Sequence, residues 1–297
     1  MDDEALRESR RVLRRVQDHL LAAHAHLGAQ RESVSLVDVI YHPTSAAPSV
    51  NYVTPRRSTA WVPVEMVQQG LARLRAHGRA ARVQFIADLY PPQFSAALRD
   101  LGLRVEYETP LLIYAAAGFA GQPAPPITAA PLPDGVNTAE VADQRGIELW
   151  WYVWRSAHYD VLTLGVEPLL VGRELAAAAQ GHQLDLILYR AGFPVGVARL
   201  SVHSQGAHLL GLALMKEART PDLLRALVGA AVRAALDRGC DLVYAPGETE
   251  TDRETLRALG FHACGSVARY APADTDSATA REAADDRILG QPVLTLR

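Results

Sequence analysis

The feature that most constrains the fold is a six-residue echo late in each half of the chain. The segment LRDLGL at 98–103 corresponds to LRALGF at 256–261. Each copy follows a predicted helix, a glycine, a strand and a second helix in the same order. Internal self-similarity of this kind indicates a repeated structural unit. We therefore expect two related α/β halves.

Composition agrees with an ordinary globular protein of two domains. The chain has 297 residues, 49% of them hydrophobic and 21% charged, which is enough apolar material for two buried cores. The formal charge of −3 is typical of neither nucleic-acid nor anionic-membrane binding. The N-terminus is acidic, and no apolar run is long enough to span a bilayer. We expect a cytoplasmic protein with no nucleic-acid or membrane partner.

The first half begins with a helix over residues 1–28, in which Leu6, Leu13, Leu20 and Leu27 recur every seven positions. Hydrophobic runs and turn residues predict the elements that follow: strands at 34–41 and 50–53, a helix at 63–77 ending at Gly78, a strand at 82–87, a helix at 92–101 and a strand pair at 104–114.

Residues 115–126 are mainly Ala, Gly and Pro, a composition typical of linkers. We place the domain boundary there, which gives a first domain at 1–114 and a second at 127–297. Near the C-terminus, 273–287 is rich in Ala, Asp and Thr, and we expect a mobile loop before a final strand at 292–296.

The second half predicts a strand at 127–132 and helices at 139–159 and 168–179. Three strands follow at 184–189, 195–203 and 208–215, joined by short turns that favour an antiparallel meander. A helix at 221–238, a strand at 241–244 and a helix at 251–259 complete the pattern, whose alternation calls for mixed, partly parallel pairing.

This order of elements resembles the GNAT N-acetyltransferases. The best local match runs from Leu212 through Glu217 and Arg219 to Gly239, and aligns with the segment in which that family binds acyl-coenzyme A. The resemblance covers 127–271 well and 34–114 weakly. It implies an α/β fold with a mixed sheet, built as two GNAT-like domains of which the first is partial, and acetyl-CoA as the donor for transfer to a small amine.

The family's phosphate-binding loop, Arg-Gly-x-Gly-x-Gly, reads Arg219-Thr220-Pro221-Asp222-Leu223-Leu224 here. Such a loop works because backbone N–H groups at a helix start bind anions and glycines allow close approach. Pro221 has no N–H, and Asp222 adds a negative charge. The segment is instead a good helix start, with a capping hydroxyl and proline in the first turn. By resemblance, the remaining donor-binding candidates are Leu212, Leu214, Arg219, Leu223, Leu224 and Arg225.

Catalytic groups are sparse in the matching segment. The family's general acid, a tyrosine, corresponds to Leu256, and the first-half counterpart is Leu98. His208 is the one titratable side chain on the strand at 208–215 and is our candidate for the base that deprotonates the amine. The alternative for His208 is an exposed position beside a turn.

Aromatic residues gather on the helix at 139–159. Trp150 and Trp154 share one face, and Trp151 shares another with His158, while Tyr159 ends the helix. These five residues are the candidate substrate pocket, because the family places its acceptor near this helix; ordinary core packing is the alternative.

Metal chemistry has no support in the sequence: His24 and His26 lie on nearly opposite sides of their helix, and motifs such as His-Glu-x-x-His do not occur.

Three hypotheses about the function stay open. The chain is an acyl-CoA-dependent N-acyltransferase, a noncatalytic ligand-binding or protein-interaction module that has lost acyl-CoA, or a structural protein that dimerises through its N-terminal helix. The sequence is compatible with a homodimer.

Overall fold

The computed structural model describes residues 3–57, 59, 61–119 and 132–273. This part of the chain divides into two compact units. Unit 1 contains residues up to 111 together with 264–273, and unit 2 contains 112–263. The sequence prediction placed the boundary within 115–126, whereas the structure divides the chain inside a strand and returns a C-terminal segment to unit 1.

Unit 1 begins with a long helix, followed by a three-stranded antiparallel sheet that is extended by further strands in the order β1-β2-β3-β4-β11-β5. β4 runs parallel to β3, and β11 runs antiparallel to β4. The elements are α1 (Asp3–His26), β1 (Gln30–Val34), β2 (Val37–Tyr41), β3 (Tyr52–Pro55), α2 (Val64–Ala76), β4 (Val83–Ile86), α3 (Pro92–Asp100), β5 (Leu103–Ala115) and β11 (His262–Pro272).

Unit 2 has the strand order β10-β9-β8-β7-β6, in which β6 to β9 are antiparallel and β10 is parallel to β9. The predicted meander is confirmed. The elements are β6 (Val136–Glu140), α4 (Gln144–Tyr159), α5 (Pro168–Ala179), β7 (Gln183–Arg190), β8 (Phe193–His203), β9 (Gly206–Leu214), α6 (Pro221–Asp237), β10 (Leu242–Pro246) and α7 (Glu250–Ala258).

The last strand of each half of the sequence crosses the boundary between the two units. β11 comes from the second half but pairs with β4, with Val267 opposite Ile86. β5 comes from the first half, and just past its end the N–H of Ala116 donates to the carbonyl of Asp241, 2.9 Å away, at the start of β10. Most of β5 and most of β11 belong to unit 1, while residues 112–115 of β5 belong to unit 2, which is why no single cut in the sequence separates the units.

The repeat predicted from the sequence is visible in the element order. In each half an antiparallel three-stranded sheet leads to a helix, a parallel strand, a helix and a final strand. The four glycines that end these helices, Gly78, Gly102, Gly239 and Gly260, all have positive φ angles, the conformation that glycine adopts without a steric cost.

Several predicted elements differ from the observed ones. The run at 34–41 is not one strand but contains the turn of the β1–β2 hairpin, because Ser35 adopts φ +54° between Val34 and Val37. The predicted strand pair at 104–114 is the single strand β5. The strand expected at 127–132 lies outside the described residues except Leu132, and β6 begins at Val136. The predicted mobile loop beyond 273 and the final strand at 292–296 also lie outside them.

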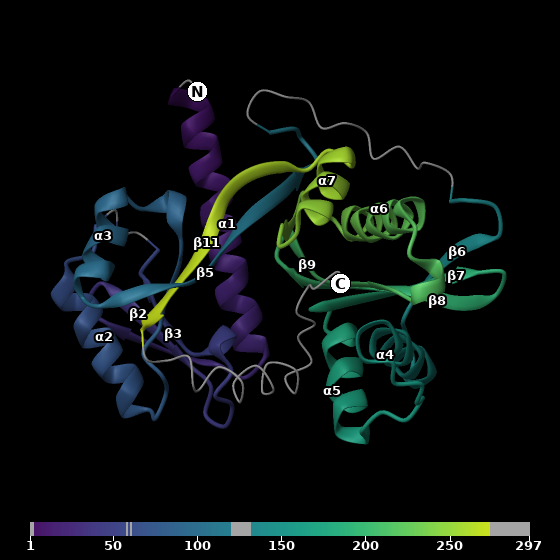
Figure 1. Cartoon of the computed structure of the whole chain (residues 1–297), viewed down its shortest axis with the longest axis horizontal. Coiled ribbons are helices and arrows are strands. Elements are labelled where there is room, and N and C mark those ends of the chain that lie inside the picture. Colours follow the sequence, from purple (N-terminus) through teal and green to yellow (C-terminus); the bar gives the residue numbers. More distant parts are fainter. Residues whose placement is uncertain (1–2, 58, 60, 120–131, 274–297) are drawn as a thin grey trace. The chain divides into compact units, whose positions relative to one another are not determined.

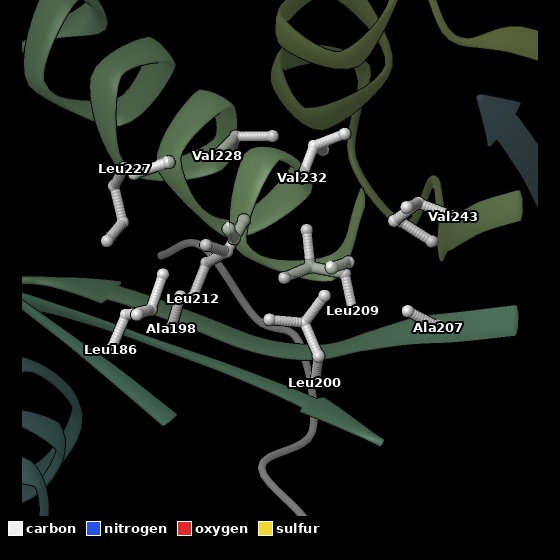
Figure 2. Close-up of a cluster of buried hydrophobic side chains, with 14 of the residues drawn as sticks. Leu186, Ala198, Leu200, Ala207, Leu209, Leu212, Leu227, Val228, Val232 and Val243 are labelled. Atoms are coloured by element: carbon white, nitrogen blue, oxygen red, sulfur yellow. The ribbon is translucent and has the colours of Figure 1, made fainter. Parts of the chain in front are cut away.

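Helices cover both faces of the unit 2 sheet (Figure 1). α6 and α7 pack on one face against Leu186, Ala198, Leu200 and Leu209 of the strands. In Figure 2, Leu227 of α6 extends toward these strand residues. α4 and α5 pack on the other face, against Ile187, Val197 and Ala213. The alternation of side chains along the strands supplies both cores.

Candidate active site

Strands β9 and β10 pair over a short segment and then diverge. They pair at three positions, from Leu242 opposite Gly206 to Tyr244 opposite His208. Beyond His208, β9 continues to Leu214 and stays paired with β8. The pairing of β9 with β10 therefore ends half-way along β9, and we call the region between the two strands beyond His208 the cleft.

A β-bulge in β9 lies next to this divergence. The register with β8 shifts between Arg199 opposite Gly211 and Leu200 opposite Leu209, which leaves Leu210 as an extra residue. A bulge bends the strand and increases its local twist. The bend accounts for the separation of the C-terminal half of β9 from β10.

A small apolar pocket lies in this cleft, between the strands β9 and β10 and the helices α6 and α7. Its lining residues are Leu209, Leu212, Leu224, Val228, Ala245, Pro246, Asp252, Thr255 and Leu256. Figure 2 shows Leu209 and Leu212 on the side of the sheet that faces Val228. Of the predicted donor-binding residues, Leu212 and Leu224 line the pocket, while Leu214 and Leu223 are buried in the adjoining core.

Leu256 occupies the position at which the resemblance implies a general-acid tyrosine. It is buried and lines the pocket. The position therefore faces the cleft, but its hydrocarbon side chain has no proton to donate.

Asp252, one turn before Leu256 on α7, is the one carboxylate that lines the pocket. Its Oδ2 accepts a hydrogen bond from the N–H of Thr249 at 2.9 Å, and the Thr249 hydroxyl accepts from the N–H of Asp252, which makes a capping box. Asp252 is 5% exposed, and its Oδ1 is buried with no hydrogen-bond partner among the described residues. A buried carboxylate oxygen in this condition is unusual in folded proteins.

Glu248 lies in the turn that joins β10 to α7. The residue is exposed as a whole, but local burial of its carboxyl, and secondarily repulsion by Asp252, raises its pKa to about 7. Two carboxyl groups thus lie close together near the α7 side of the cleft.

The segment that would hold a diphosphate is occupied by bonds within the chain. Arg219 donates from Nε to the carbonyl of Leu214 at 3.3 Å and from Nη2 to the carbonyl of Ala157 at 2.6 Å. The N–H of Thr220 donates to Ala218, and the N–H of Leu223 donates to the Thr220 hydroxyl. Thr220 is thus the cap of α6, as the sequence predicts.

The first turn of α6 supplies neither an unpaired cation nor a backbone that a phosphate could approach closely. Pro221 is its first residue, and Asp222 forms an ion pair with Arg225, the last of the predicted donor-binding residues. An anion at this helix start would meet the Asp222 carboxylate, and Pro221 has no N–H to offer. The diphosphate of CoA therefore does not fit the residues present.

His208 and Tyr244 form the last paired position before the strands separate. Their rings stack at a centroid distance of 4.4 Å and an angle of 10°. Because side chains alternate along a strand, both rings lie on the face of the sheet opposite to Leu209 and Ala245, which line the pocket. The candidate base is thus at the apex of the cleft but on its other face.

The tryptophans predicted to border a substrate pocket lie in the core beneath that opposite face. Trp150, Trp151 and Trp154 are each less than 9% exposed. The rings of Trp150 and Trp154 stack 5.4 Å apart, which confirms that they share a face. Trp150 also donates from Nε1 to the carbonyl of Ala198 at 3.1 Å. The structure places these side chains in the packed core of unit 2.

A buried ionic cluster that the sequence prediction missed lies against the tryptophans. Arg199 donates from Nη2 to Glu174 and to Asp185, both at 2.7 Å, and its guanidinium lies 4.0 Å from the Trp150 ring centroid. Burial disfavours the charge of Arg199, but the carboxylates of Asp185 and Glu174 outweigh that effect and raise its pKa. The cluster fixes α5 to strands β7 and β8.

The other two aromatic candidates lie at the end of α4. His158 has its ring 4.2 Å from that of Trp154, and burial, followed by the nearby charge of Arg219, lowers its pKa to about 4. Tyr159 is 47% exposed. The site candidates on α4 therefore include three core residues, one half-buried histidine and one exposed tyrosine.

The described residues contain neither a metal-ligand cluster nor a membrane-spanning helix. No three His, Cys, Asp or Glu side chains are grouped so that they could ligate a metal ion. None of the helices in this part of the chain has the length and hydropathy needed to cross a bilayer.

Comparison of the structure with solved structures identifies the fold. A GCN5-related N-acetyltransferase from Kribbella flavida superposes with a TM-score of 0.69 at 15% identity, over 90% of this chain and 98% of that chain. The chain therefore has the GNAT fold. A tandem GNAT protein from the clavulanic acid biosynthesis pathway gives a TM-score of 0.56 at 10% identity, over 91% and 94%.

A GCN5-related N-acetyltransferase from Sphaerobacter thermophilus also has this fold, with a TM-score of 0.51 at 13% identity over 79% of each chain. No family model matches the sequence, and no curated protein matches it. The GNAT fold predicted from the sequence is thus confirmed, and coverage of nearly the whole chain by a tandem protein agrees with two GNAT-like domains.

Proposed function

We propose that this protein transfers an acyl group from a thioester donor to a small primary amine in the cleft of unit 2. The observation that carries the proposal is the divergence of β9 from β10 with an apolar pocket between them. A gap in a sheet leaves backbone N–H and C=O groups without a neighbouring strand, and such groups are available to a ligand. An extended, amide-containing thioester arm suits both these groups and the apolar walls.

The reaction requires the amine nitrogen to attack the thioester carbonyl carbon. A nitrogen–carbon bond forms, the carbon–sulfur bond breaks, and the products are an amide, a thiol and one proton released to solvent. The ammonium must first lose a proton to a base. Because Leu256 replaces the tyrosine, the departing thiolate takes its proton from water or from another group in this proposal.

His208 is the base in this proposal. It lies at the apex of the cleft on the face opposite to the pocket, so that an amine approaching from that face would meet a donor approaching from the α6 and α7 side. Its stacking on Tyr244 fixes the orientation of the imidazole ring. An imidazole has a pKa suited to proton transfer near neutral pH.

A second candidate function is a noncatalytic ligand-binding module with the GNAT fold. The observation that favours it is the bonding of Arg219 to two backbone carbonyls, together with the capped start of α6, which leaves no site for a diphosphate. This candidate predicts ligand binding in the cleft without acyl transfer.

The test is a thiol-release assay with acetyl-CoA and S-acetyl-pantetheine as donors and a panel of alkyl, aryl-alkyl and polyamine acceptors. We expect amine-dependent thiol release from at least one donor. The variant His208→Gln should lower that rate at least tenfold, while the matched variant His203→Gln, on the other side of the β8–β9 turn, should not. Binding of a donor without turnover for any amine would favour the second candidate, and absence of both would contradict both.

A further inference from the structure

The cleft contains a polar group that neither the fold nor the resemblance assigns to the donor. Asp252 is 95% buried in the pocket wall, and its Oδ1 has no partner among the described residues. Leaving a buried charged oxygen unsatisfied is costly. A ligand in the pocket that presents a hydrogen-bond donor would remove that cost.

The chain itself already supplies a hydrogen bond to the other oxygen of this carboxylate. Oδ2 accepts from the Thr249 N–H, and the residue is in the first turn of α7, where the helix dipole favours an anion. The remaining oxygen therefore needs a hydrogen-bond donor and does not need a cation. The secondary amides of a pantetheine-type thioester arm supply neutral N–H donors of this kind.

The basic side chains near the two helix starts are already bound within the chain. Arg225 pairs with Asp222, and Arg253 and Arg257 pair with Glu250. Arg253 also donates to the carbonyl of Gly247 at 2.7 Å. The positive charges that a diphosphate would require thus have partners, and two further acids, Glu248 and Asp252, lie near the same end of the cleft.

We infer that Asp252 recognises the acyl donor through a carboxylate–amide hydrogen bond, and that the donor is a thioester of an amide-bearing thiol without a diphosphate. This inference rests on the proposed function and names the substrate class of the same site. The residue that recognises the donor then lies at the start of α7. It does not lie at the start of α6, where the GNAT loop would bind phosphate. The thioester arm, and not the nucleotide, then determines affinity.

Calorimetry on the full chain with S-acetyl-pantetheine and acetyl-CoA tests this inference. We expect S-acetyl-pantetheine to bind with an affinity equal to or higher than that of acetyl-CoA. A preference of tenfold or more for acetyl-CoA would overturn the inference while leaving the proposed function intact. Failure of both to bind would contradict the proposed function as well.

The variant Asp252→Asn tests the residue directly. An asparagine can keep the cap by accepting from Thr249, but it lacks the charge that strengthens the bond to an amide. We expect a loss of S-acetyl-pantetheine affinity of about tenfold or more, since hydrogen bonds to charged groups contribute about 1.5–3 kcal/mol. Unchanged affinity in a folded variant would overturn the inference.

Two matched variants keep the result interpretable. Thr249→Ala removes the hydroxyl half of the capping box and leaves the carboxylate in place, so it should lower stability with affinity changed less than threefold. An equal loss of affinity in Thr249→Ala would mean that Asp252 acts through the helix start, which would overturn its role in recognition. The double variant Pro221→Gly, Asp222→Gly should raise acetyl-CoA affinity and leave S-acetyl-pantetheine affinity unchanged. A gain for both donors would count against separate recognition of the arm.

Discussion

Arg219 donates a hydrogen bond from Nη2 to the carbonyl oxygen of Ala157, 2.6 Å away in the last turn of α4. It is the one residue kept from the phosphate-loop pattern, and its second bond, to Leu214, ties it to the end of β9. Its side chain therefore joins α4 to the strand that borders the cleft. The arginine that matches the loop pattern thus makes structural contacts here.

Replacing Arg219 with Gln should therefore affect stability more than ligand binding. We expect a loss of about 1–2 kcal/mol in the free energy of unfolding, because two carbonyl bonds are lost. Affinity for acetyl-CoA should change less than threefold. Urea denaturation and calorimetry measure the two effects, with Arg225→Ala, an exposed pair worth about 0–1 kcal/mol, as the control. A tenfold loss of acetyl-CoA affinity with unchanged stability would show that Arg219 binds phosphate.

Removing the buried charge of Arg199 should be one of the most destabilising single changes in unit 2. Arg199→Met leaves Glu174 and Asp185 buried without their cation, and we expect a loss of about 3–5 kcal/mol. Adding Glu174→Gln and Asp185→Asn should recover much of that loss, since no uncompensated charge then remains. Denaturation of the single and triple variants checks this; an equally unstable triple variant would instead indicate that packing against Trp150 dominates.

Local signals in the sequence predicted much of the fold. Thr220 and Pro221 mark the start of α6, and glycines such as Gly78 and Gly239 mark helix ends, because capping and positive φ are properties of a few neighbouring residues. The β1–β2 turn was missed because Ser35, which is not a glycine, adopts the left-handed conformation inside an apolar run. Nothing local distinguishes that serine from a strand residue.

The parts of the site that depend on distant contacts were not predictable in the same way. Thr249 and Asp252 can be read as a helix start, but the position of that carboxylate in the cleft depends on how α7 packs beside β9. The sequence correctly predicts that Trp150 and Trp154 share one face of their helix. Whether that face is buried depends on contacts with residues such as Arg199, which is 45 or more positions away in the chain. The pairing of β11 with β4 is likewise long-range.

A matched pair of glycine substitutions tests the packing of helices on the sheets. In α2, a Cβ at Gly70 would lie 2.8 Å from Val37 Cγ2 and 2.9 Å from Val53 Cγ1, whereas a Cβ at Gly172 in α5 meets nothing within 4 Å. We expect Gly70→Ala to destabilise by about 1–3 kcal/mol through overpacking and Gly172→Ala to stabilise by about 0.5–1 kcal/mol through helix propensity. Thermal unfolding of both variants measures the difference, and stabilisation by both would show that α2 can move away from β2 and β3.

His24 should make unit 1 sensitive to mild acid. Burial, followed by the charge of Arg269, lowers its pKa from 6.5 to about 4, while its Nδ1 lies 2.7 Å from the Tyr52 hydroxyl. The unfolded chain therefore binds the proton more readily than the folded one. The stabilisation is complete above pH 6.5 and is lost as the pH falls from 6.5 toward 4, at about 1.4 kcal/mol per unit.

The variant His24→Gln removes this titration, and the exposed His26→Gln on the same helix is its control. Between pH 7 and pH 4.5 the free energy of unfolding should fall by about 2–3 kcal/mol more in the wild type than in His24→Gln. His26→Gln changes an exposed residue of the same helix and should follow the wild type. Urea denaturation at the two pH values decides the matter: parallel losses in wild type and His24→Gln would mean that the buried imidazole becomes protonated without unfolding α1 from β3.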